Sequence, residues 1–311
     1  MQQLAICSKC QKKTSVYFRQ YSGEHLCRSC FIFSIEEKAS RTISKFSMVN
    51  YGDKIAVGVS GGKDSLSLLL ILKGLFDRKK TNDLIAITID EGIAGYRDES
   101  LKIVKEFCSR LNIKNEIFSY KELFGIDMDE SMSIRPSEKM TSCSICGTFR
   151  RRAIDIATDY VGANVIATGH NLDDQLQSFM INVISGDVNR IGWTYPEPIS
   201  YGSKKIKKIK PFIEIYEREI VFYALQQNIP FQSEQCPYQD ESIRSEIREF
   251  FNSLEENRSG VKYNTFSSIL KISKILKNND NSLKNTCDVC GYESTRPICS
   301  VCNNLRILKN T

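Results

Sequence analysis

The chain has 311 residues, of which 41% are hydrophobic and 26% charged, a composition that excludes an intrinsically disordered protein. This length can hold one large folded domain with smaller modules attached to it. The longest apolar run, residues 66–72, is far shorter than the roughly 20 residues that cross a bilayer, and no signal-peptide pattern precedes Cys7. We therefore expect a cytoplasmic protein that does not bind a membrane.

The 12 cysteines are many for such a protein, and ten of them occur in C-x-x-C pairs. Without an oxidising compartment, these pairs indicate metal binding or catalysis rather than disulfides. Two pairs near each terminus have the spacing of a four-cysteine zinc site, in which four protein ligands make the metal structural. Unrelated buried thiols are the alternative, but two such groups in one chain favour zinc. The predicted ligands are Cys7, Cys10, Cys27 and Cys30 at the N-terminus, and Cys287, Cys290, Cys299 and Cys302 at the C-terminus.

The net charge of +6 is concentrated at the two ends of the chain. Residues 1–50 carry +5, residues 255–311 carry +4, and the region between them carries −3. Basic modules beside a near-neutral domain favour a polyanionic partner such as nucleic acid, although ordinary solvated surface gives the same counts. We predict three parts: a zinc finger at residues 1–34, a catalytic domain at 35–255, and a basic helix (259–278) with a second zinc finger at 256–311.

Between the zinc fingers, apolar runs alternate with segments of helical periodicity. Strands are predicted at residues 55–59, 84–89, 116–119 and 164–168, and helices at 64–76, 97–111 and 147–161. This alternation indicates βαβ units, and hence an α/β fold with a parallel sheet covered by helices on both faces. Ligands of such sheets bind beyond the carboxyl ends of the strands, so the functional motifs should follow strands directly.

The first such motif is Ser60-Gly61-Gly62-Lys63-Asp64-Ser65. Its glycines allow the backbone to approach an anion closely, and the following helix offers free N–H groups and the positive end of its dipole. Lys63 adds a cation, and the two serines add hydroxyl donors. The motif is therefore a predicted phosphate-binding loop, although it lacks the Walker A spacing.

The second motif, Gly169-His170-Asn171-Leu172-Asp173-Asp174-Gln175, follows the fourth predicted strand. Paired carboxylates beside a phosphate site suit Mg²⁺, whereas the same acids at a helix N-terminus also favour the helix dipole. The two roles are compatible. His170 is one of only two histidines, and it is either a site residue or a hydrogen-bonded core residue.

The third C-x-x-C pair, Cys143 and Cys146, has no second pair nearby, but Cys236 offers one more thiol downstream. Three thiolates can hold a [4Fe–4S] cluster that keeps one iron without a protein ligand. The alternatives are a redox pair that uses persulfide or disulfide chemistry with Cys236 as the resolving thiol, and buried thiols without function. Cys108 stands alone in a predicted helix and is expected in the core.

Residues 60–65 resemble the PP-loop of the N-type ATP pyrophosphatases, which cleave ATP between its α and β phosphates. This loop, G-H-N-x-D-D, C-S-I-C-G-x-x-R-R, a later C-P and the terminal four-cysteine modules together resemble the tRNA 2-thiouridine synthetases of the TtuA type and their wobble-uridine relatives. The resemblance implies a PP-loop fold, similar to that of the adenine nucleotide α-hydrolases. It also implies ATP-dependent 2-thiolation of a tRNA uridine, at a loop or the wobble position, with AMP and pyrophosphate as products.

Carried onto this chain, the resemblance assigns ATP to the loop, Mg²⁺ to the phosphates and an acid, and catalytic roles to Asp174, Lys63 and Arg150. Gln175 stands where many relatives are expected to carry an acid, which weakens the case for a third carboxylate at the Mg²⁺ site. The cluster ligands are Cys143, Cys146 and Cys236. The predicted nucleotide-binding residues are Val59, Ser60, Gly61, Gly62, Lys63, Asp64, Ser65, Ile89, Arg150, Gly169, His170 and Asp173.

The resemblance further implies tRNA as a partner, a sulfur donor that is a ubiquitin-like protein thiocarboxylate or sulfide, and a homodimer. A lysine-rich segment is either solvated surface or a track for RNA phosphates; it contains Lys204, Lys205, Lys207, Lys208 and Lys210. Two other classes stay open: another PP-loop tRNA-modifying enzyme such as a lysidine ligase, and a non-catalytic zinc-bearing RNA-binding protein. The three additional cysteines disfavour the first, and the intact loop disfavours the second.

Overall fold

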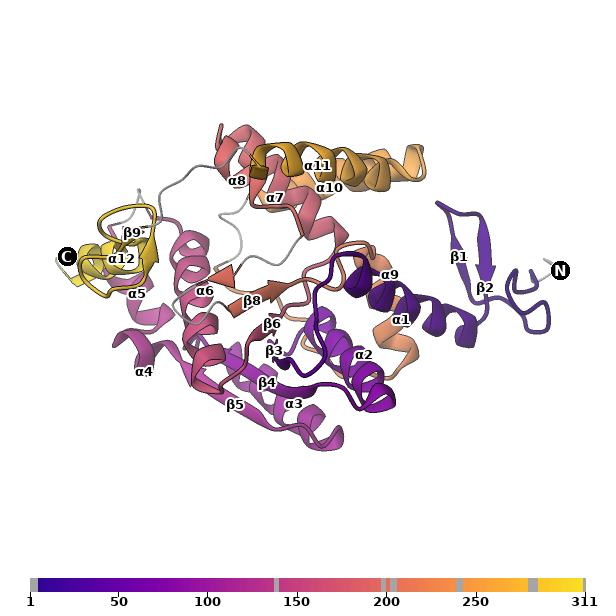
Figure 1. Cartoon of the computed structure of the whole chain (residues 1–311), viewed down its shortest axis with the longest axis horizontal. Helices are drawn as coiled ribbons and strands as arrows, with labels where there is room; N and C mark the ends of the chain where they lie inside the picture. The colour runs from indigo at the N-terminus through magenta and orange to yellow at the C-terminus, as the bar shows by residue number, and fades with distance from the viewer. Residues whose placement is uncertain are drawn as a thin grey trace.

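A computed structural model of the chain describes residues 5–136, 140–196, 200–201, 206–238, 243–278 and 285–309. Its centre is a six-stranded sheet in the order β5-β4-β3-β6-β8-β7, in which β7 runs antiparallel to β8 and the other neighbours run parallel (Figure 1). The parallel sheet is confirmed, and each of the four predicted strands lies within one residue of an observed one. The strands are β3 (Lys54–Gly58), β4 (Asp83–Asp90), β5 (Asn115–Ser119), β6 (Val165–Ala167), β7 (Ser200–Tyr201) and β8 (Ile206–Ile209).

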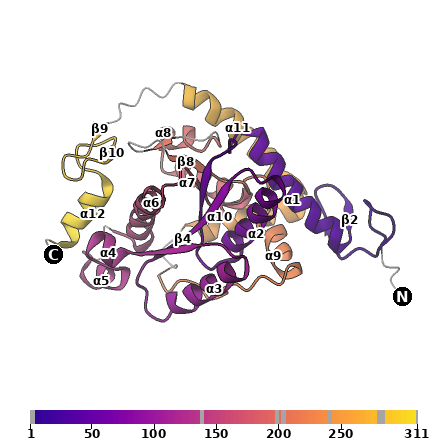
Figure 2. The same cartoon turned by 60° about the horizontal axis from the view of Figure 1, so that its bottom comes forward.

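Successive residues of a strand point to opposite faces of the sheet, and here the side chains on both faces are buried in a hydrophobic core. In β3, Ile55 and Val57 join one hydrophobic core, whereas Ala56 joins the other. On one face, the sheet forms a core with α2 (Lys63–Lys79), α3 (Arg97–Arg110) and α9 (Glu217–Gln226), and α1 (Arg28–Lys45) packs on these helices. On the other face, it forms a core with α4 (Tyr120–Phe124), α5 (Met128–Ile134) and α6 (Ser142–Tyr160) (Figure 1 and Figure 2). Helices therefore cover both faces, as predicted.

The three helices predicted in this region correspond to α2, α3 and α6. α6 begins five residues earlier than predicted, at Ser142, because the Thr141 side chain caps it by accepting the Ser144 N–H. Cys143 and Cys146 therefore lie in the first turns of a helix. Cys108 of α3 is buried in the core, which confirms its predicted position.

Four further helices form a group along one side of the sheet (Figure 1). They are α7 (Leu172–Ile184), α8 (Val188–Gly192), α10 (Arg244–Asn257) and α11 (Val261–Asn278), and α11 confirms the basic helix predicted near the C-terminus. Phe266 and Ile269 of α11 are buried in the core. None of the helices in the described part of the chain is long and apolar enough to cross a membrane.

The terminal modules lie at opposite ends of the molecule (Figure 1). The N-terminal module contains the hairpin of β1 (Tyr17–Arg19) and β2 (Glu24–Leu26), and the C-terminal module contains β9 (Asn285–Thr286), β10 (Glu293–Ser294) and α12 (Ser300–Lys309). α1 begins one residue after Cys27 and runs without a break through the predicted boundary at residue 34. The first module therefore continues into the body as a helix rather than as a flexible linker.

The lysine-rich segment does not form a continuous basic surface. Lys207 and Lys208 belong to β8, so their side chains diverge, and they lie 3.9 and 2.6 Å from the carboxylates of Asp53 and Asp155. Lys210 donates to the Gln175 side chain at 3.4 Å. Lys204 and Lys205 lie outside the described residues. The described lysines of this segment therefore do not form a continuous track for RNA phosphates.

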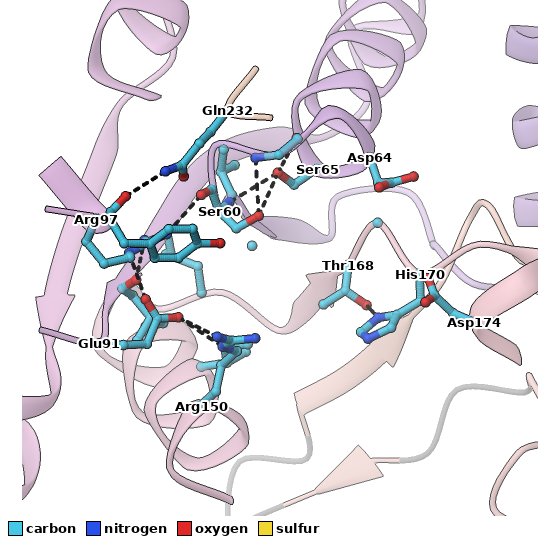
Figure 3. Close-up of a pocket in the computed structure, with 18 residues that line it drawn as sticks. Ser60, Asp64, Ser65, Glu91, Arg97, Arg150, Thr168, His170, Asp174 and Gln232 are labelled. Carbon is cyan, nitrogen blue, oxygen red and sulfur yellow. Dashed lines mark hydrogen bonds and ion pairs between the residues drawn. The ribbon is translucent and has the colours of Figure 1, made fainter. Parts of the chain in front are cut away.

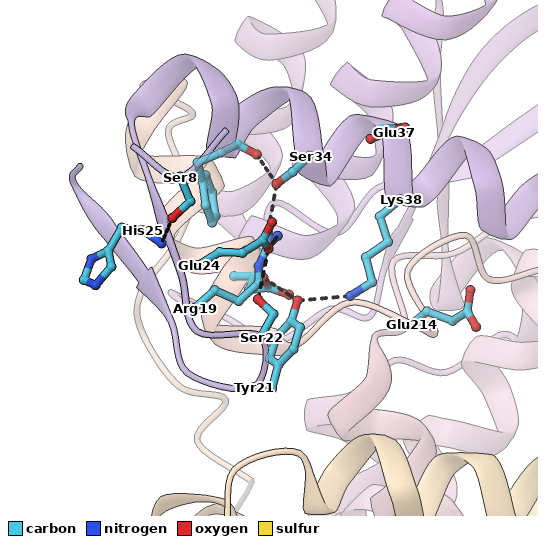
Figure 4. A network of polar contacts seen from close by, with 12 residues as sticks. Ser8, Arg19, Tyr21, Ser22, Glu24, His25, Ser34, Glu37, Lys38 and Glu214 are labelled. Atoms are coloured by element: carbon cyan, nitrogen blue, oxygen red, sulfur yellow. Dashed lines mark hydrogen bonds and ion pairs between the residues drawn. The ribbon is translucent and has the colours of Figure 1, made fainter. Parts of the chain in front are cut away.

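A buried arginine, Arg19, joins the N-terminal module to the body (Figure 4). Its Nε lies 2.7 Å from a carboxylate oxygen of Glu219 in α9, and its other nitrogens donate to Glu24 at 3.0 Å and to Ser34 of α1 at 2.8 Å. The Tyr21 hydroxyl donates to the same Glu219 carboxylate at 3.0 Å. Because the Arg19 and Glu219 side chains are 7% and 0% exposed, neither charge can turn to water when its partner is lost.

We expect Arg19→Ala to lower the free energy of unfolding by about 3–5 kcal/mol, since it leaves the Glu219 carboxylate buried and unpaired. Arg41→Ala is the matched control: this arginine of α1 pairs with Glu37 in an exposed i,i+4 position, and its loss should cost about 0.3–0.5 kcal/mol. Denaturant unfolding of both variants measures the difference. Equal costs for the two would contradict the role given to Arg19.

Candidate functional site

The carboxyl ends of β3, β4 and β6 surround a cavity of about 430 Å³ (Figure 3). This is the edge at which parallel α/β sheets bind ligands. The predicted site residues in its lining are Val59, Ser60, Gly62, Asp64, Ser65, Ile89, Arg150, Gly169, His170 and Asp174. Three other predicted nucleotide-binding residues, Gly61, Lys63 and Asp173, are not among the lining residues.

The loop at residues 60–65 has the form of an anion cradle. Gly62 is the N-cap of α2 and carries no side-chain cap, so the first N–H groups of the helix face the loop. The Ser60 hydroxyl accepts the Gly62 N–H at 3.4 Å and lies 3.3 Å from the Ser65 hydroxyl. Gly61 has a φ of +86°, and a Cβ atom there would lie 2.8 Å from the Cβ of Ser100. The loop can therefore hold a phosphate group, and Gly61 serves its shape rather than direct binding.

The G-H-N-x-D-D motif packs directly on this cradle. A Cβ atom on Gly169 would lie 2.9 Å from backbone atoms of Asp64 and Ser65, so only glycine allows the two loops to approach this closely. Asn171 donates to the Asp64 carboxylate at 3.2 Å and, with Asp174, forms a capping box at the start of α7. The two sequence motifs therefore form one site.

Two of the acids that line the cavity, Asp64 and Asp174, belong to the two sequence motifs. Burial raises the pKa of each carboxyl above its ordinary value, and the Asp64 pKa is raised further by the charge of Asp174. Oxygen ligands in such a negative environment suit Mg²⁺ bound together with phosphates. The sequence indicated Asp173 and Asp174 as the carboxylate pair, whereas Asp64 and Asp174 line the cavity and Asp173 does not.

Asp173 faces away from the cavity because neighbouring residues of a helix point in different directions. It forms a buried ion pair with Lys262 of α11 and accepts the Glu217 N–H of α9 at 2.8 Å. Lys63 also turns away from the lining: its Nζ lies 2.9 Å from the Glu217 carboxylate and 3.0 Å from that of Asp64. Although burial opposes the charge, these carboxylates raise the pKa of Lys63 and keep it protonated.

His170 lies at the rim of the cavity, with its Nδ1 2.9 Å from the Thr168 hydroxyl (Figure 3). Desolvation within the cavity wall and the positive charges of Lys210, Arg244 and Arg150 lower its pKa to about 3. The ring is therefore neutral at pH 7 and can donate or accept a hydrogen bond, but it supplies no positive charge. Of the two roles left open by the sequence, the position favours a site residue.

Cys143, Cys146 and Cys236 come from two segments that meet beside the cavity. The Ser142 hydroxyl donates to the Tyr238 carbonyl at 2.9 Å, which holds the segment after Cys236 against the start of α6. The three thiols do not form a group as compact as the terminal ones among the described residues. Among the described residues they therefore form no compact group of the zinc type, and a [4Fe–4S] cluster, whose thiolates bind different irons, does not require one.

Arg150 connects this group to the cavity, because it lines the cavity and donates to the Cys146 Sγ at 3.3 Å. Glu91 and Arg97, which the motif analysis missed, complete this wall of the cavity together with Tyr96 and Gln232. Glu91 follows β4 directly, so the rule that ligands bind at the carboxyl ends of strands could have identified it. Arg97 begins a helix and had no comparable signal.

Both terminal groups of four cysteines fit a zinc ion. Within each group, all four Sγ atoms lie within 4.8 Å of one another. The Cys10–Cys27 and Cys290–Cys299 Sγ separations are both 3.8 Å. A tetrahedral zinc ion with Zn–S bonds of about 2.3 Å places its sulfurs about 3.8 Å apart.

The C-terminal group is held against α6 by Arg152. Its two terminal nitrogens each lie 3.5 Å from a sulfur, one from Cys290 and one from Cys299. The guanidinium also lies over the Tyr292 ring, 3.3 Å from its centroid. A positive group in this position offsets the negative charge of a four-thiolate zinc site. The same helix thus contacts the C-terminal module, contributes Arg150 to the cavity wall and carries Cys143 and Cys146.

We expect two zinc ions per wild-type chain, and Cys27→Ala should retain one, since three thiolates hold the ion much less tightly than four. Cys108→Ala is the control, because burial raises the pKa of the Cys108 thiol to about 11 and the residue lies in the core. Elemental analysis of the purified variants measures the zinc content. Two ions in Cys27→Ala, or one in Cys108→Ala, would contradict the assignment.

We also expect Glu217→Gln to tighten Mg²⁺–ATP binding, because it frees Lys63 to turn toward the phosphates. The expected fall in Kd is up to about tenfold, equivalent to about 1.4 kcal/mol. Glu214→Gln is the matched control, since Glu214 pairs with Lys45 at 2.6 Å and does not line the cavity. Isothermal titration calorimetry measures both, and an unchanged or weaker affinity in Glu217→Gln would show that Lys63 is not held back by this pair.

A family model described as the PP-loop domain matches residues 35–254, and a model of the N-terminal LIM domain of 2-thiouridine synthetase TtuA matches residues 6–32. The chain is 35% identical over 306 residues to cytoplasmic tRNA 2-thiolation protein 1 of Aspergillus niger, covering 96% of this chain and 87% of that protein. It is 32% identical over 312 residues to tRNA 2-thiolation protein NcsA of Haloferax volcanii, covering 95% and 97%.

Among solved structures, the U34-tRNA thiolase NcsA of Methanococcus maripaludis with its [4Fe-4S] cluster matches with a TM-score of 0.84 and 31% identity. The match covers 98% of this chain and 97% of that one. The two family models cover the loop, the cavity and the cysteine pairs up to residue 254, and the curated relatives and this structure match nearly the whole chain. The chain therefore belongs to the PP-loop family of tRNA 2-thiolation proteins.

Proposed function

We propose that this protein is a cytoplasmic, ATP-dependent tRNA-uridine 2-sulfurtransferase that acts on the uridine at position 34. One observation carries the proposal: the phosphate-type loop (residues 60–65) lines the cavity, and Arg150, which lines it as well, contacts the Sγ of Cys146 at 3.3 Å. The names of similar proteins supply the substrate and compartment, since the curated relative is a cytoplasmic tRNA 2-thiolation protein and the solved structure is a U34-tRNA thiolase.

The nucleotide would lie with its phosphates against residues 60–65. The uncapped start of α2 and the hydroxyls of Ser60 and Ser65 support this placement. Asp64 would hold Mg²⁺ together with the phosphates, and the ion would neutralise phosphate charge. Lys63 would reach the phosphates after leaving Glu217.

In the first step, the O2 oxygen of the uridine attacks the α-phosphorus of ATP. The bond from the α-phosphorus to the bridging oxygen breaks, and pyrophosphate leaves. The loop N–H groups and Lys63 stabilise the charge that develops on the leaving group. Asp174 accepts the proton lost from N3 of the uridine, a role that its raised pKa supports.

In the second step, a sulfur at the oxidation level of sulfide attacks C2, the C2–O bond breaks, and AMP leaves. The sulfur loses its proton as the C2=S bond forms, and N3 regains the proton that it lost in the first step. Arg150 holds the departing phosphate. Cys143, Cys146 and Cys236 would hold a [4Fe–4S] cluster, which when bound supplies an iron without a protein ligand that can carry the sulfur. The donor would be a protein thiocarboxylate or sulfide.

The terminal modules would bind the tRNA. The net positive charge lies on the two parts that carry the proposed zinc sites, residues 1–34 and 256–311, and not on residues 35–255. Positively charged side chains bind the phosphates of the RNA backbone. A homodimer is a further part of the proposal, and size-exclusion chromatography with light scattering tests it separately.

The test is to incubate the anaerobically prepared protein with tRNA, Mg²⁺–ATP and sulfide. Nucleoside mass spectrometry should find 2-thiouridine at position 34, with AMP and pyrophosphate formed in equal amounts. Cys236→Ala should lose both the bound iron and thiolation, whereas Cys108→Ala should keep both, because only the first removes a thiolate beside the cavity.

The outcomes separate the alternatives. Thiolation that persists without iron would indicate a persulfide route through the cysteine pair. AMP formation without 2-thiouridine would indicate another PP-loop modification, such as amidation of the lysidine type. Binding of tRNA without AMP formation would leave a non-catalytic RNA-binding protein.

A further inference from the structure

The wall of the cavity contains three buried or half-buried charges in a row (Figure 3). Glu91 lies between Arg97 and Arg150, and its side chain is 5% exposed. One of its oxygens lies 2.7 Å from Arg97 Nε, and the other lies 2.9 Å from both Nε and Nη2 of Arg150. A carboxylate buried between two guanidinium groups is costly to desolvate and therefore calls for a functional reason.

The Arg97 end of this row is fixed. Its Nη1 donates to the Ser60 carbonyl of the phosphate-type loop at 3.0 Å, and its Nη2 donates to the Ile89 carbonyl at the end of β4 at 2.6 Å. Its Nε makes an ion-pair contact with Glu91 without a hydrogen bond, and its side chain is only 6% exposed, so Arg97 has little freedom to move. It therefore holds the Glu91 carboxylate in place from behind.

The Glu91 backbone is fixed as well. Its carbonyl accepts the Met128 N–H at 2.9 Å, and the next residue, Gly92, has a φ of +69°. A Cβ atom on Gly92 would lie 2.5 Å from the Cβ of Asp127, so the turn after Glu91 is packed tightly against the start of α5. Contacts other than those with Arg150 therefore fix the position of both the main chain and the carboxylate of Glu91.

The Arg150 end is open. Its side chain is 50% exposed, it lines the cavity, and its Nη2 also reaches the Cys146 Sγ at 3.3 Å. Glu91 neutralises one of the two guanidinium groups, so one positive charge remains in the row, on the side that faces the cavity. Contact with the rigid Glu91 gives this flexible side chain a single orientation, between the cysteine and the space for the phosphates.

We propose that Glu91 is a positioning residue for the thiolation reaction: anchored by Arg97 to the phosphate-type loop, it holds Arg150 between Cys146 and the nucleotide. This inference rests on the proposed function. The role of Glu91 extends the proposed function, because the ionic row Arg97–Glu91–Arg150 makes one continuous connection from the Ser60 carbonyl to the Cys146 sulfur. A displacement of the phosphate-type loop would then reach Cys146 through Glu91, and a displacement of Cys146 would reach the loop in the same way.

The test is a double-mutant cycle with Glu91→Gln, Arg150→Gln and the combined variant in the full chain. Misplacing a group by about 1 Å can cost about 100-fold in rate, so Glu91→Gln should lower kcat for thiolation by about 10- to 100-fold. The Kd for ATP should change by less than about threefold, as expected for a group used in the transition state. The combined variant should be no slower than Arg150→Gln alone.

A second readout does not depend on turnover. Hydrogen bonds to the ligand sulfurs tune the potential of an iron–sulfur cluster, and Arg150 makes such a bond only while Glu91 orients it. Arg150→Gln, and Glu91→Asp, which keeps the negative charge but withdraws it from Arg150, should therefore both lower the cluster reduction potential. Glu99→Gln, which removes an exposed carboxylate from α3, is the matched control and should leave both potential and kcat unchanged.

Losses that multiply in the combined variant, or wild-type kcat in Glu91→Gln, would overturn the proposal. If Glu91→Gln does not fold, Glu91→Asp keeps the charge that Arg97 requires but withdraws it from Arg150, and the same cycle applies. If the wild-type chain forms AMP without 2-thiouridine, the thiolation proposal fails, while the cycle on AMP formation still tests Glu91.

Discussion

The close contact between two loops at the carboxyl edge of the sheet is the constraint on which the site depends. Gly169, after β6, lies against the backbone of Asp64 and Ser65, after β3, with no room for a Cβ atom. Parallel pairing of these two strands brings both loops to the same edge, and the packing of glycine on backbone joins them. Asp64 and Asp174 line one cavity because of this contact.

The helix α6 extends the same arrangement in a second direction. Its first turns carry Cys143 and Cys146, its middle carries Arg150, and Arg152 contacts the sulfurs of the C-terminal module. These residues lie on different sides of one rigid element, so a displacement of the helix would move all of them together. We infer that the C-terminal module stabilises the position of the cysteines beside the cavity as well as offering a basic surface.

The sequence was sufficient for the parts of the fold and site that depend on local pattern. The strands, the phosphate-type loop and the terminal cysteine groups follow from periodicity and spacing along the chain. The contacts that orient side chains do not, since they join residues far apart in sequence. Lys63 turns to Glu217, Asp173 pairs with Lys262, and neither partner belongs to a motif.

Two further differences have the same origin. The lysines of β8 resembled a phosphate track because their sequence is basic, but a strand directs neighbouring side chains apart, and carboxylates from distant elements meet them. Glu91 lies directly after a strand, where ligands of parallel sheets bind, but it belongs to no motif with a recognisable spacing. Its function becomes visible only when Arg97 and Arg150 are seen on either side of it.

The central claim is that one cavity joins the nucleotide site to the three additional cysteines. Anomalous diffraction at the iron edge, from anaerobic crystals soaked with a non-hydrolysable ATP analogue, tests it most directly. The account predicts iron peaks enclosed by the sulfurs of Cys143, Cys146 and Cys236, with the analogue's phosphates against residues 60–65 in the same cavity. Iron confined to the terminal cysteine groups, or phosphates bound away from that loop, would contradict it.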